Sequence, residues 1–465
     1  MSGQREAGAQ PAGEGCRADE LAAATCGTIA PSAAEPRPWL RGVLWLLFLG
    51  PFFFASYGFS NWLAASSDVA GVIVFGWERQ IPFLAWTIVP YWSIDLLYGL
   101  SFLLCRDRRE TDRHALRLLT AQIISVSCFV LFPLRFSFER PATDGFFGLM
   151  FDVLMGFDKP FNQAPSLHIG LLVILWARYA AVSPAGWRWA VHLWAALIGL
   201  SVVTTYQHHF FDLPTGALVG AFCLWLWPDR GASPLARPRV TASAQRRRLA
   251  RNYLLGALAC VLAASPGGVA LWLLWPAVAL AVVAYNYAVA GADGFQKTEG
   301  RFSCGATLLL LPYLVAAWLN SRWWTRRHPE PDPIVDGVWL GRVPATREIA
   351  GHGFGAVLDL TAELAAPAGP WRYVNLAWLD LVPPGRDQLA AAARHIDHLR
   401  RDGPVLVCCA LGYSRSACAV AAWLLDSGRA ASVDEALARI AARRPRLALG
   451  PAHRIALASL KASGA

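Results

Sequence analysis

Long apolar runs fill much of the chain before residue 320, and they constrain the fold more than any other feature. A bilayer-crossing helix needs about 20 apolar residues, and runs near that length lie at 43–64, 82–104, 117–136, 167–183, 188–206, 213–228, 252–265, 268–288 and 304–320. The last three are shorter and are interrupted by Pro or Gly, so we expect one of them to be interfacial or re-entrant. The composition agrees, with 55% hydrophobic residues, 16% charged residues and 21 tryptophans. We therefore predict an all-α polytopic membrane domain.

The positive charge has a distribution typical of membrane proteins. The net charge is +10, and its basic residues cluster beside apolar runs at 106–109, 246–248 and 322–327. Such clusters mark cytoplasmic loops and favour membrane anchoring over nucleic-acid binding. With the amino terminus inside, an even number of spans keeps the carboxy-terminal part in the cytoplasm. We expect a multi-pass protein of the inner cell membrane, with membrane lipids around it and an oligomeric state that the sequence leaves open.

The chain divides into four parts by composition. Residues 1–37 are rich in Ala, Gly, Pro and Glu and predict a disordered tail. Residues 38–230 form the main helical domain, and 231–328 add a basic loop and further membrane segments. The Pro-rich stretch 328–333 is a stiff linker, and 329–465 predict a small α/β domain with a central sheet flanked by helices.

A thiol stands at the end of an apolar strand in this last part. Residues 404–407 read Pro-Val-Leu-Val, and Cys409, Gly412, Arg415 and Ser416 follow. A strand, a tight loop and a helix start can hold phosphate through successive backbone amides and the positive helix end. The amides are those of Ala410, Leu411, Gly412, Tyr413 and Ser414, and Arg415 can grip two phosphate oxygens. The same field favours the thiolate form of Cys409, which is a nucleophile.

Cys-x-x-Gly-x-x-Arg-Ser after an apolar strand resembles the cysteine-dependent protein phosphatases of the dual-specificity branch. Strand-like runs at 333–361 and 373–380 are similar to that family's opening. The resemblance implies a phosphocysteine on Cys409, a general acid roughly thirty residues earlier, and a serine, Ser416, that helps the thiolate leave. Asp380 fits the acid. No metal or cofactor is implied, since the loop and Arg415 supply the charge stabilisation.

Other residues near the motif have less specific roles. Asp359 lies within a strand and is expected to serve the fold, and Asp387 is expected to cap the helix 388–401. Cys408 stands where the family usually has His, and a redox-sensitive pair with Cys409 is an alternative for it. The substrate stays open between phosphotyrosine, phosphoserine or phosphothreonine proteins and phosphorylated lipid headgroups of the phosphoinositide or phosphatidylglycerophosphate type.

A second polar set lies among the apolar runs. His168 precedes one run, and His208 and Asp212 lie between two later ones, so all three fall at one membrane face. Polar groups there are costly unless they are used. One imidazole can attack phosphorus while the carboxylate orients it, and the other imidazole can protonate the leaving group. The alternative is that these residues only tie helix ends together.

Pro-Ser-x-His at 165–168 and His-x-x-x-Asp at 208–212 resemble the type 2 phosphatidic acid phosphatase superfamily. The resemblance implies His208 as nucleophile, Asp212 as its orienting carboxylate, His168 as acid, and Arg140 and Arg135 as phosphate ligands. Leu167 and Val202 depart from the usual motifs, as in the inositol phosphorylceramide synthase branch. Hydrolase, transferase and silent anchor or lipid sensor therefore all stay open for this half. The whole chain resembles a bacterial-type fusion of the two families, acting on a phosphoprotein or a phospholipid.

Overall fold

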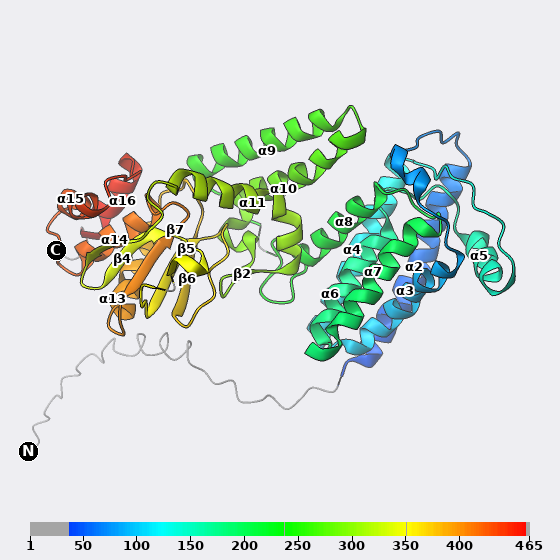
Figure 1. Ribbon diagram of the computed structural model, residues 1–465, viewed down its shortest axis with the longest axis horizontal. Helices are drawn as coiled ribbons and strands as arrows, with labels where there is room; N and C mark the ends of the chain where they lie inside the picture. Colours follow the sequence, from blue (N-terminus) through cyan, green and yellow to red (C-terminus); the bar gives the residue numbers. More distant parts are fainter. Residues whose placement is uncertain (1–36, 237, 350, 462–465) are drawn as a thin grey trace, which may run out of the picture.

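The structure is a computed structural model that describes residues 37–236, 238–349 and 351–461. Most of the tail expected at 1–37 lies outside the described residues. Figure 1 shows a bundle of helices from the first half of the chain, a sheet with its own helices from the last quarter, and the helices α9, α10 and α11 between them. This is the predicted order of a helical part followed by an α/β part.

The bundle contains one helix for each of the first six predicted apolar runs, although α4 begins nine residues before the predicted start at 117. They are α2 (Trp39–Ala65), α3 (Ile88–Ser101), α4 (Arg108–Leu131), α6 (Leu167–Val182), α7 (Arg188–Thr204) and α8 (Asp212–Leu226). A further helix, α5 (Gly145–Phe157), lies between the predicted runs 117–136 and 167–183, where the sequence analysis assigned no helix. Its sequence is apolar except for Asp152, so the pattern gave no amphipathic signal for a helix.

Glycines bring α6 and α8 into close contact. A Cβ atom on Gly216 would lie 2.3 Å from the carbonyl oxygen of Ser166, and one on Gly220 would lie 2.6 Å from that of Gly170. Small residues allow two helix backbones to approach in this way. The amino-terminal ends of both helices are therefore held side by side, and each carries part of the predicted His/His/Asp set.

Six helical segments of the described residues are long and apolar enough to cross a membrane. They are Trp39–Ala65, Ala85–Leu104, Arg108–Leu131, Ala185–Thr204, Gly268–Phe295 and Cys304–Thr325. The apolar helices Gly145–Phe157, Leu167–Val182 and Asp212–Leu226 are shorter. These segments indicate a membrane-spanning amino-terminal region.

Helices α9 to α11 connect the bundle to the sheet. They comprise α9 (Ala244–Ala264), the 3₁₀ turn Gly268–Leu273, α10 (Leu274–Tyr285), a π turn at Asn286–Ala290, a 3₁₀ turn at Gly291–Phe295, the hairpin strands β1 (Lys297–Thr298) and β2 (Arg301–Phe302), and α11 (Cys304–Thr325). The side chain of Gln296 donates to the carbonyl oxygen of Trp225 at 2.6 Å, and the indole of Trp225 donates to Gly294 at 2.8 Å. The hairpin is thus attached to the carboxy-terminal end of α8.

The sheet has five strands in the order β3-β4-β7-β5-β6. The strands are β3 (Asp332–Val335), β4 (Val338–Arg342), β5 (Ala356–Thr361), β6 (Arg372–Trp378) and β7 (Val405–Cys409). β3 is antiparallel to β4, and the other pairs are parallel. The carboxyl ends of the parallel strands therefore meet at one edge, where α/β proteins place their sites.

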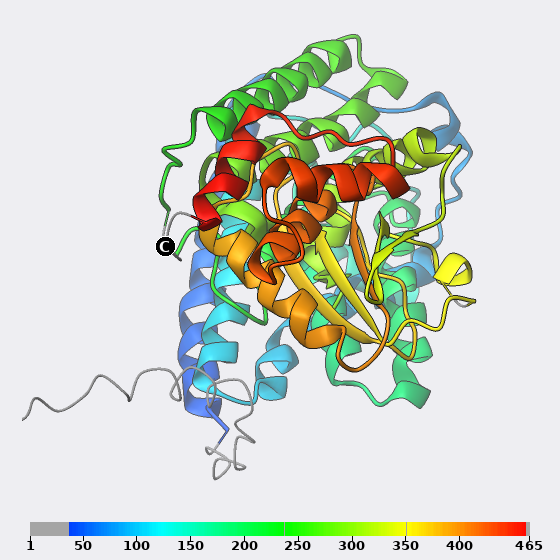
Figure 2. The ribbon, with the colours of Figure 1, turned by 90° about the vertical axis from the view of Figure 1, so that its left-hand side faces the viewer.

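Helices cover both faces of the sheet. One face packs against α13 (Arg386–Leu399), α14 (Arg415–Asp426), α15 (Val433–Arg443) and α16 (Pro451–Lys461), which Figure 2 shows in orange to red beside the strands. The other face carries α12 (Thr346–Ile349) and, through Ala317, the helix α11. A helix from the apolar part of the chain is therefore part of the α/β packing.

Candidate functional site

The loop between β7 and α14 surrounds the thiol of Cys409, which is only 2% exposed. The backbone N–H of Gly412 donates to its sulfur at 3.3 Å, and the hydroxyl of Ser416 donates at 3.2 Å. Two donors aimed at one sulfur can stabilise negative charge that develops on it in a reaction. Gly412 has a φ of +75°, and a Cβ atom there would lie 2.6 Å from the backbone carbon of Gly341. Only glycine fits this turn, which fixes the loop around the sulfur.

Arg415 is the first residue of α14 and is held by an acidic residue that the sequence analysis missed. Its guanidinium donates to both carboxylate oxygens of Glu363, at 2.9 and 2.5 Å, and to the carbonyl oxygen of Trp378 at 2.9 Å. Both side chains of the pair are at most 5% exposed. Burial opposes ionisation of Glu363, but the charge of Arg415 outweighs it and lowers the pKa of that carboxyl group. The bidentate pair orients the guanidinium.

Asp380 follows β6 and faces the same guanidinium. One of its carboxylate oxygens lies 3.1 Å from Arg415, and its side chain is 38% exposed. Burial of the carboxyl group raises its pKa, the nearby charge of Glu363 adds to this, and Arg415 opposes it. A carboxyl group with a raised pKa keeps its proton to higher pH, which suits a general acid. The structure thus brings together Cys409, Arg415, Asp380 and Ser416.

The other acids and the neighbouring thiol lie away from this centre. Asp359 is buried and accepts from Lys297 at 2.6 Å, in agreement with a role in the fold. Asp387 lies in the first turn of α13, but the residue at the cap position is Gly385, so the predicted capping role is wrong. Cys408 is buried among residues on the opposite face of the sheet from Cys409, because successive strand residues alternate. This placement disfavours a bond between the two sulfurs.

Residues from the α9–α11 region contact the loops of the site. The hydroxyl of Ser321 in α11 donates to the carbonyl oxygen of Ala410 at 2.5 Å. The phenol of Tyr287 donates to the carbonyl oxygen of Asp380 at 3.1 Å, and the amide of Gln245 donates to that of Leu381 at 3.2 Å. The site is therefore built against the membrane-associated helices.

The predicted His/His/Asp set also comes together, at the opposite end of α8 from the hairpin. The Nδ1 atom of His208 lies 3.0 Å from a carboxylate oxygen of Asp212, and both side chains are buried. His168 stacks on Tyr91 with ring centroids 4.1 Å apart, and its buried Nε2 atom has no partner among the described residues. An imidazole held by a carboxylate beside a second, unpaired imidazole can carry out nucleophilic and acid chemistry.

The predicted phosphate ligands of this second set differ in their placement. Arg140 reaches the loop after α7, where its Nε atom donates to the carbonyl oxygen of Thr205 at 3.2 Å. Arg135 is exposed, and its backbone N–H donates to the carbonyl oxygen of Gly71 at 2.9 Å, so the structure does not bring it to the histidines. Asp158, which the sequence analysis missed, accepts from Tyr57 at 2.8 Å and lies close enough to His208 for an electrostatic interaction.

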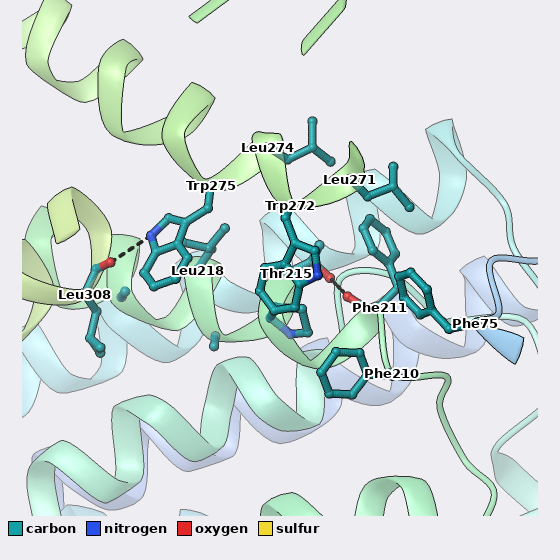
Figure 3. Close-up of a pocket in the computed structure, with 13 residues that line it drawn as sticks. Phe75, Phe210, Phe211, Thr215, Leu218, Leu271, Trp272, Leu274, Trp275 and Leu308 are labelled. Carbon is teal, nitrogen blue, oxygen red and sulfur yellow. Dashed lines mark hydrogen bonds between the residues drawn. The ribbon is translucent and has the colours of Figure 1, made fainter. Parts of the chain in front are cut away.

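An apolar cavity adjoins the loop that carries His208 and Asp212 (Figure 3). The empty space, including the part open to solvent, is about 710 Å³, and it is lined by Phe75, Phe210, Phe211, Pro214, Thr215, Ala217, Leu218, Ala221, Leu271, Trp272, Leu274, Trp275 and Leu308. The hydroxyl of Thr215 is used by the backbone, because it donates to the carbonyl oxygens of Phe211 and Asp212 at 3.0 Å each. The lining therefore offers hydrocarbon contacts rather than polar ones.

Comparison with known proteins shows which family the carboxy-terminal part of the chain matches. Residues 338–462 match the family model described as dual specificity phosphatase, catalytic domain. No curated protein matches the sequence. Similar solved structures include Tk-PTP in the active form, with 26% identity over 29% of this chain and 99% of that one at a TM-score of 0.27. Human DUSP28 has 20% identity over 28% of this chain and 96% of that one at a TM-score of 0.26. PTPMT1 in complex with PI(5)P has 21% identity over 28% of this chain and 97% of that one, also at 0.26. The family match identifies residues 338–462 as a phosphatase domain of the protein tyrosine/dual-specificity type.

Proposed function

We propose that the chain is an integral membrane phosphatase that hydrolyses phosphomonoesters through a phosphocysteine on Cys409. The observation that carries the proposal is the convergence at one sulfur. Gly412 and Ser416 donate to the Cys409 sulfur, and Arg415, the first residue of α14, lies 3.1 Å from the carboxylate of Asp380. A nucleophile, a phosphate-binding cation and an acid are the parts that such a reaction needs.

The first chemical step transfers the phosphoryl group to the protein. The thiolate of Cys409 attacks phosphorus, the bond between phosphorus and the leaving oxygen breaks, and Asp380 gives its proton to that oxygen. The loop amides and the guanidinium of Arg415 stabilise the equatorial oxygens. Glu363 contributes by holding Arg415 in its bidentate orientation.

The second step releases phosphate. A water molecule attacks phosphorus, the bond to sulfur breaks, and the Asp380 carboxylate takes the proton that the water gives up. The Ser416 hydroxyl, 3.2 Å from the sulfur, donates to the departing thiolate. The phosphoester classes that fit are phosphotyrosine, phosphoserine and phosphothreonine, with a phosphorylated lipid headgroup as the alternative.

The test uses the full-length protein in detergent micelles, with an aryl phosphate as substrate. The Cys409→Ser variant keeps the size of the side chain but should lose turnover, and the wild type should form a trappable phosphoenzyme. Cys304→Ser is the matched control, since Cys304 is exposed and lies in α11. Retained turnover in the Cys409→Ser variant would remove the assignment.

We place the phosphatase domain in the cytoplasm. It packs against the hairpin 297–302, which is attached to the carboxy-terminal end of α8, and the basic residues Arg113 and Arg117 contact residues 227–231 at the same end. Basic clusters favour the cytoplasmic face. Protease protection of oriented vesicles tests this, because a protected carboxy-terminal domain in right-side-out vesicles is the expected result.

A second phosphoryl-transfer site in the helical bundle is the other candidate function. The 3.0 Å pairing of His208 with Asp212, beside the unpartnered Nε2 atom of His168, supports it. The adjoining apolar cavity supports a lipid as the substrate. In a Cys409→Ser background, turnover of labelled phospholipids should remain and should then disappear on adding His208→Ala. Unchanged lipid turnover in the double variant would leave the bundle as an anchor or lipid sensor.

A further inference from the structure

The loop that carries Asp380 has a strained backbone. Leu381, the next residue, has a φ of +57° and is 61% exposed. A residue other than glycine rarely adopts this left-handed backbone conformation. The conformation costs free energy and persists only when the surrounding structure holds it. Something must therefore fix this loop in place.

Arg415 contacts the Asp380 side chain from within the phosphatase domain, and two hydrogen bonds to the backbone of this loop come from outside the domain. The carbonyl oxygen of Asp380 accepts from the hydroxyl of Tyr287 at 3.1 Å. The carbonyl oxygen of Leu381 accepts from the side-chain amide of Gln245 at 3.2 Å. Tyr287 belongs to the π turn after α10, and Gln245 to the first turn of α9. The flanking side chains of Leu379 and Val382 pack in the same apolar cluster as Tyr287.

Tyr287 is itself held rigidly. It is 1% exposed, and its ring lies 5.2 Å from that of Tyr253. Its carbonyl oxygen accepts from the Nε atom of Arg246 at 2.9 Å. A π turn inserts one residue into a helix and often marks a functional position. The turn here directs a buried phenol at the backbone of the acid loop.

We propose that Tyr287 is a positioning residue for the phosphatase reaction, through which the membrane-associated helices set the orientation of Asp380. The inference rests on the proposed role of Asp380 as the acid. The phenol holds the backbone carbonyl and leaves the carboxyl group free, so the side chain keeps its approach to Arg415 and to the leaving oxygen. Without the bond, the loop relaxes from the conformation at Leu381 and the acid loses its alignment.

This role predicts a dependence on the leaving group. Proton donation matters for a phosphate ester with a basic leaving group and hardly at all for one that leaves as a stable anion. In the full-length protein, Tyr287→Phe should lower kcat/KM for phenyl phosphate about fivefold, the rate equivalent of one ordinary hydrogen bond. The loss for 4-nitrophenyl phosphate should be less than about twofold.

The matched control is Tyr285→Phe. Tyr285 lies in the same segment, but its hydroxyl donates to the carbonyl oxygen of Pro234 at 3.0 Å rather than to the acid loop. It should keep the wild-type ratio of the two rates. Adding Tyr287→Phe to an Asp380→Asn variant should cause no further loss, because an absent acid cannot be misplaced.

Equal losses for both esters, or losses that add to those of Asp380→Asn, would overturn the proposal and leave Tyr287 with a structural role. If the Tyr287→Phe protein fails to fold, Gln245→Ala tests the same loop from the partly exposed second contact. A leaving-group-independent result there would also overturn it. Failure of the proposed function itself is distinct, because it appears as retained turnover in Cys409→Ser.

Discussion

The buried ion pair between Lys297 and Asp359 links the β1–β2 hairpin to the phosphatase sheet, and breaking it gives a sharp test. The ammonium of Lys297 donates to Asp359 at 2.6 Å and to the carbonyl and hydroxyl oxygens of Thr361 at 3.0 Å each. Both charged side chains are 1% exposed. We predict that Lys297→Met destabilises the phosphatase domain, because it leaves a carboxylate buried without its countercharge.

The structure sets the size of the effect. Removing one partner of a buried pair typically costs 3–5 kcal/mol. Here Asp359 keeps bonds from the Tyr373 hydroxyl and from the backbone N–H and hydroxyl of Thr361, each at 2.8 Å. We therefore expect a loss of unfolding free energy at the lower end of that range, about 3 kcal/mol. This corresponds to a fall of roughly 10 °C in the midpoint of thermal inactivation.

The assay is residual aryl phosphatase activity of the full-length protein after heating to a series of temperatures. Arg401→Met is the matched control, since it breaks the ion pair of Arg401 with Asp397, in which Arg401 is 67% exposed. Exposed pairs are worth less than about 1 kcal/mol. Restoration of most of the midpoint by Lys297→Met combined with Asp359→Asn would show that the uncompensated charge is the cause. A midpoint for Lys297→Met equal to that of Arg401→Met would refute the reasoning.

Three further predictions concern the site. Asp380→Asn should slow phenyl phosphate about 10²- to 10⁴-fold and 4-nitrophenyl phosphate far less. The same variant should abolish the loss of phenyl phosphate turnover that the wild type shows as pH rises through the raised pKa of Asp380, as measured by pH–rate profiles; equal losses would move the acid elsewhere. Because folding lowers the pKa of Glu363, its ionised carboxylate stabilises the folded protein at pH values above the unfolded pKa of about 4.3, and this stabilisation is lost as pH falls through the folded pKa. Glu363→Gln should flatten this part of a plot of unfolding free energy against pH. An unchanged slope would contradict the pairing with Arg415. Gly412→Ala should abolish activity because its Cβ atom would collide with Gly341, whereas Gly428→Ala, with nothing within 4 Å, should keep activity and only lower stability; similar activity in both would contradict the close packing.

The fold was predictable wherever one local pattern determined it. Apolar runs of bilayer length predicted the helices of the bundle, and the run 82–104 became the segment Ala85–Leu104. The strand, glycine turn and helix around Cys409 could be predicted because apolar strand residues, a turn glycine and a helix start each follow from the local sequence. Helix α5 was missed, since its 13 residues, which lie between Asp144 and Asp158, are almost all apolar and have no distinct periodicity.

The site was predictable only in the part that a motif records. Cys409, Arg415 and Ser416 are close in the chain, and Asp380 followed from the family spacing. Glu363 follows β5 with no spacing signal, and its meeting with Arg415 depends on the parallel pairing of β5 with β7. Tyr287 is one aromatic residue in an apolar run and resembled a membrane residue. Long-range contacts of this kind arise from tertiary packing, which local sequence does not encode.

The packing of α11 against the second face of the sheet has a consequence for how the protein is made. Ala317 contributes to the core of the phosphatase domain, and Ser321 holds the first carbonyl of the phosphate loop. The loop after β7 gains this hydrogen bond only once α11 is in place, and α11 precedes the domain in the chain. A ribosome delivers the apolar helices first, so maturation of the phosphatase follows their insertion. On the proposed function, we therefore expect a chain whose apolar helices fail to insert to have lower phosphatase activity than the inserted protein.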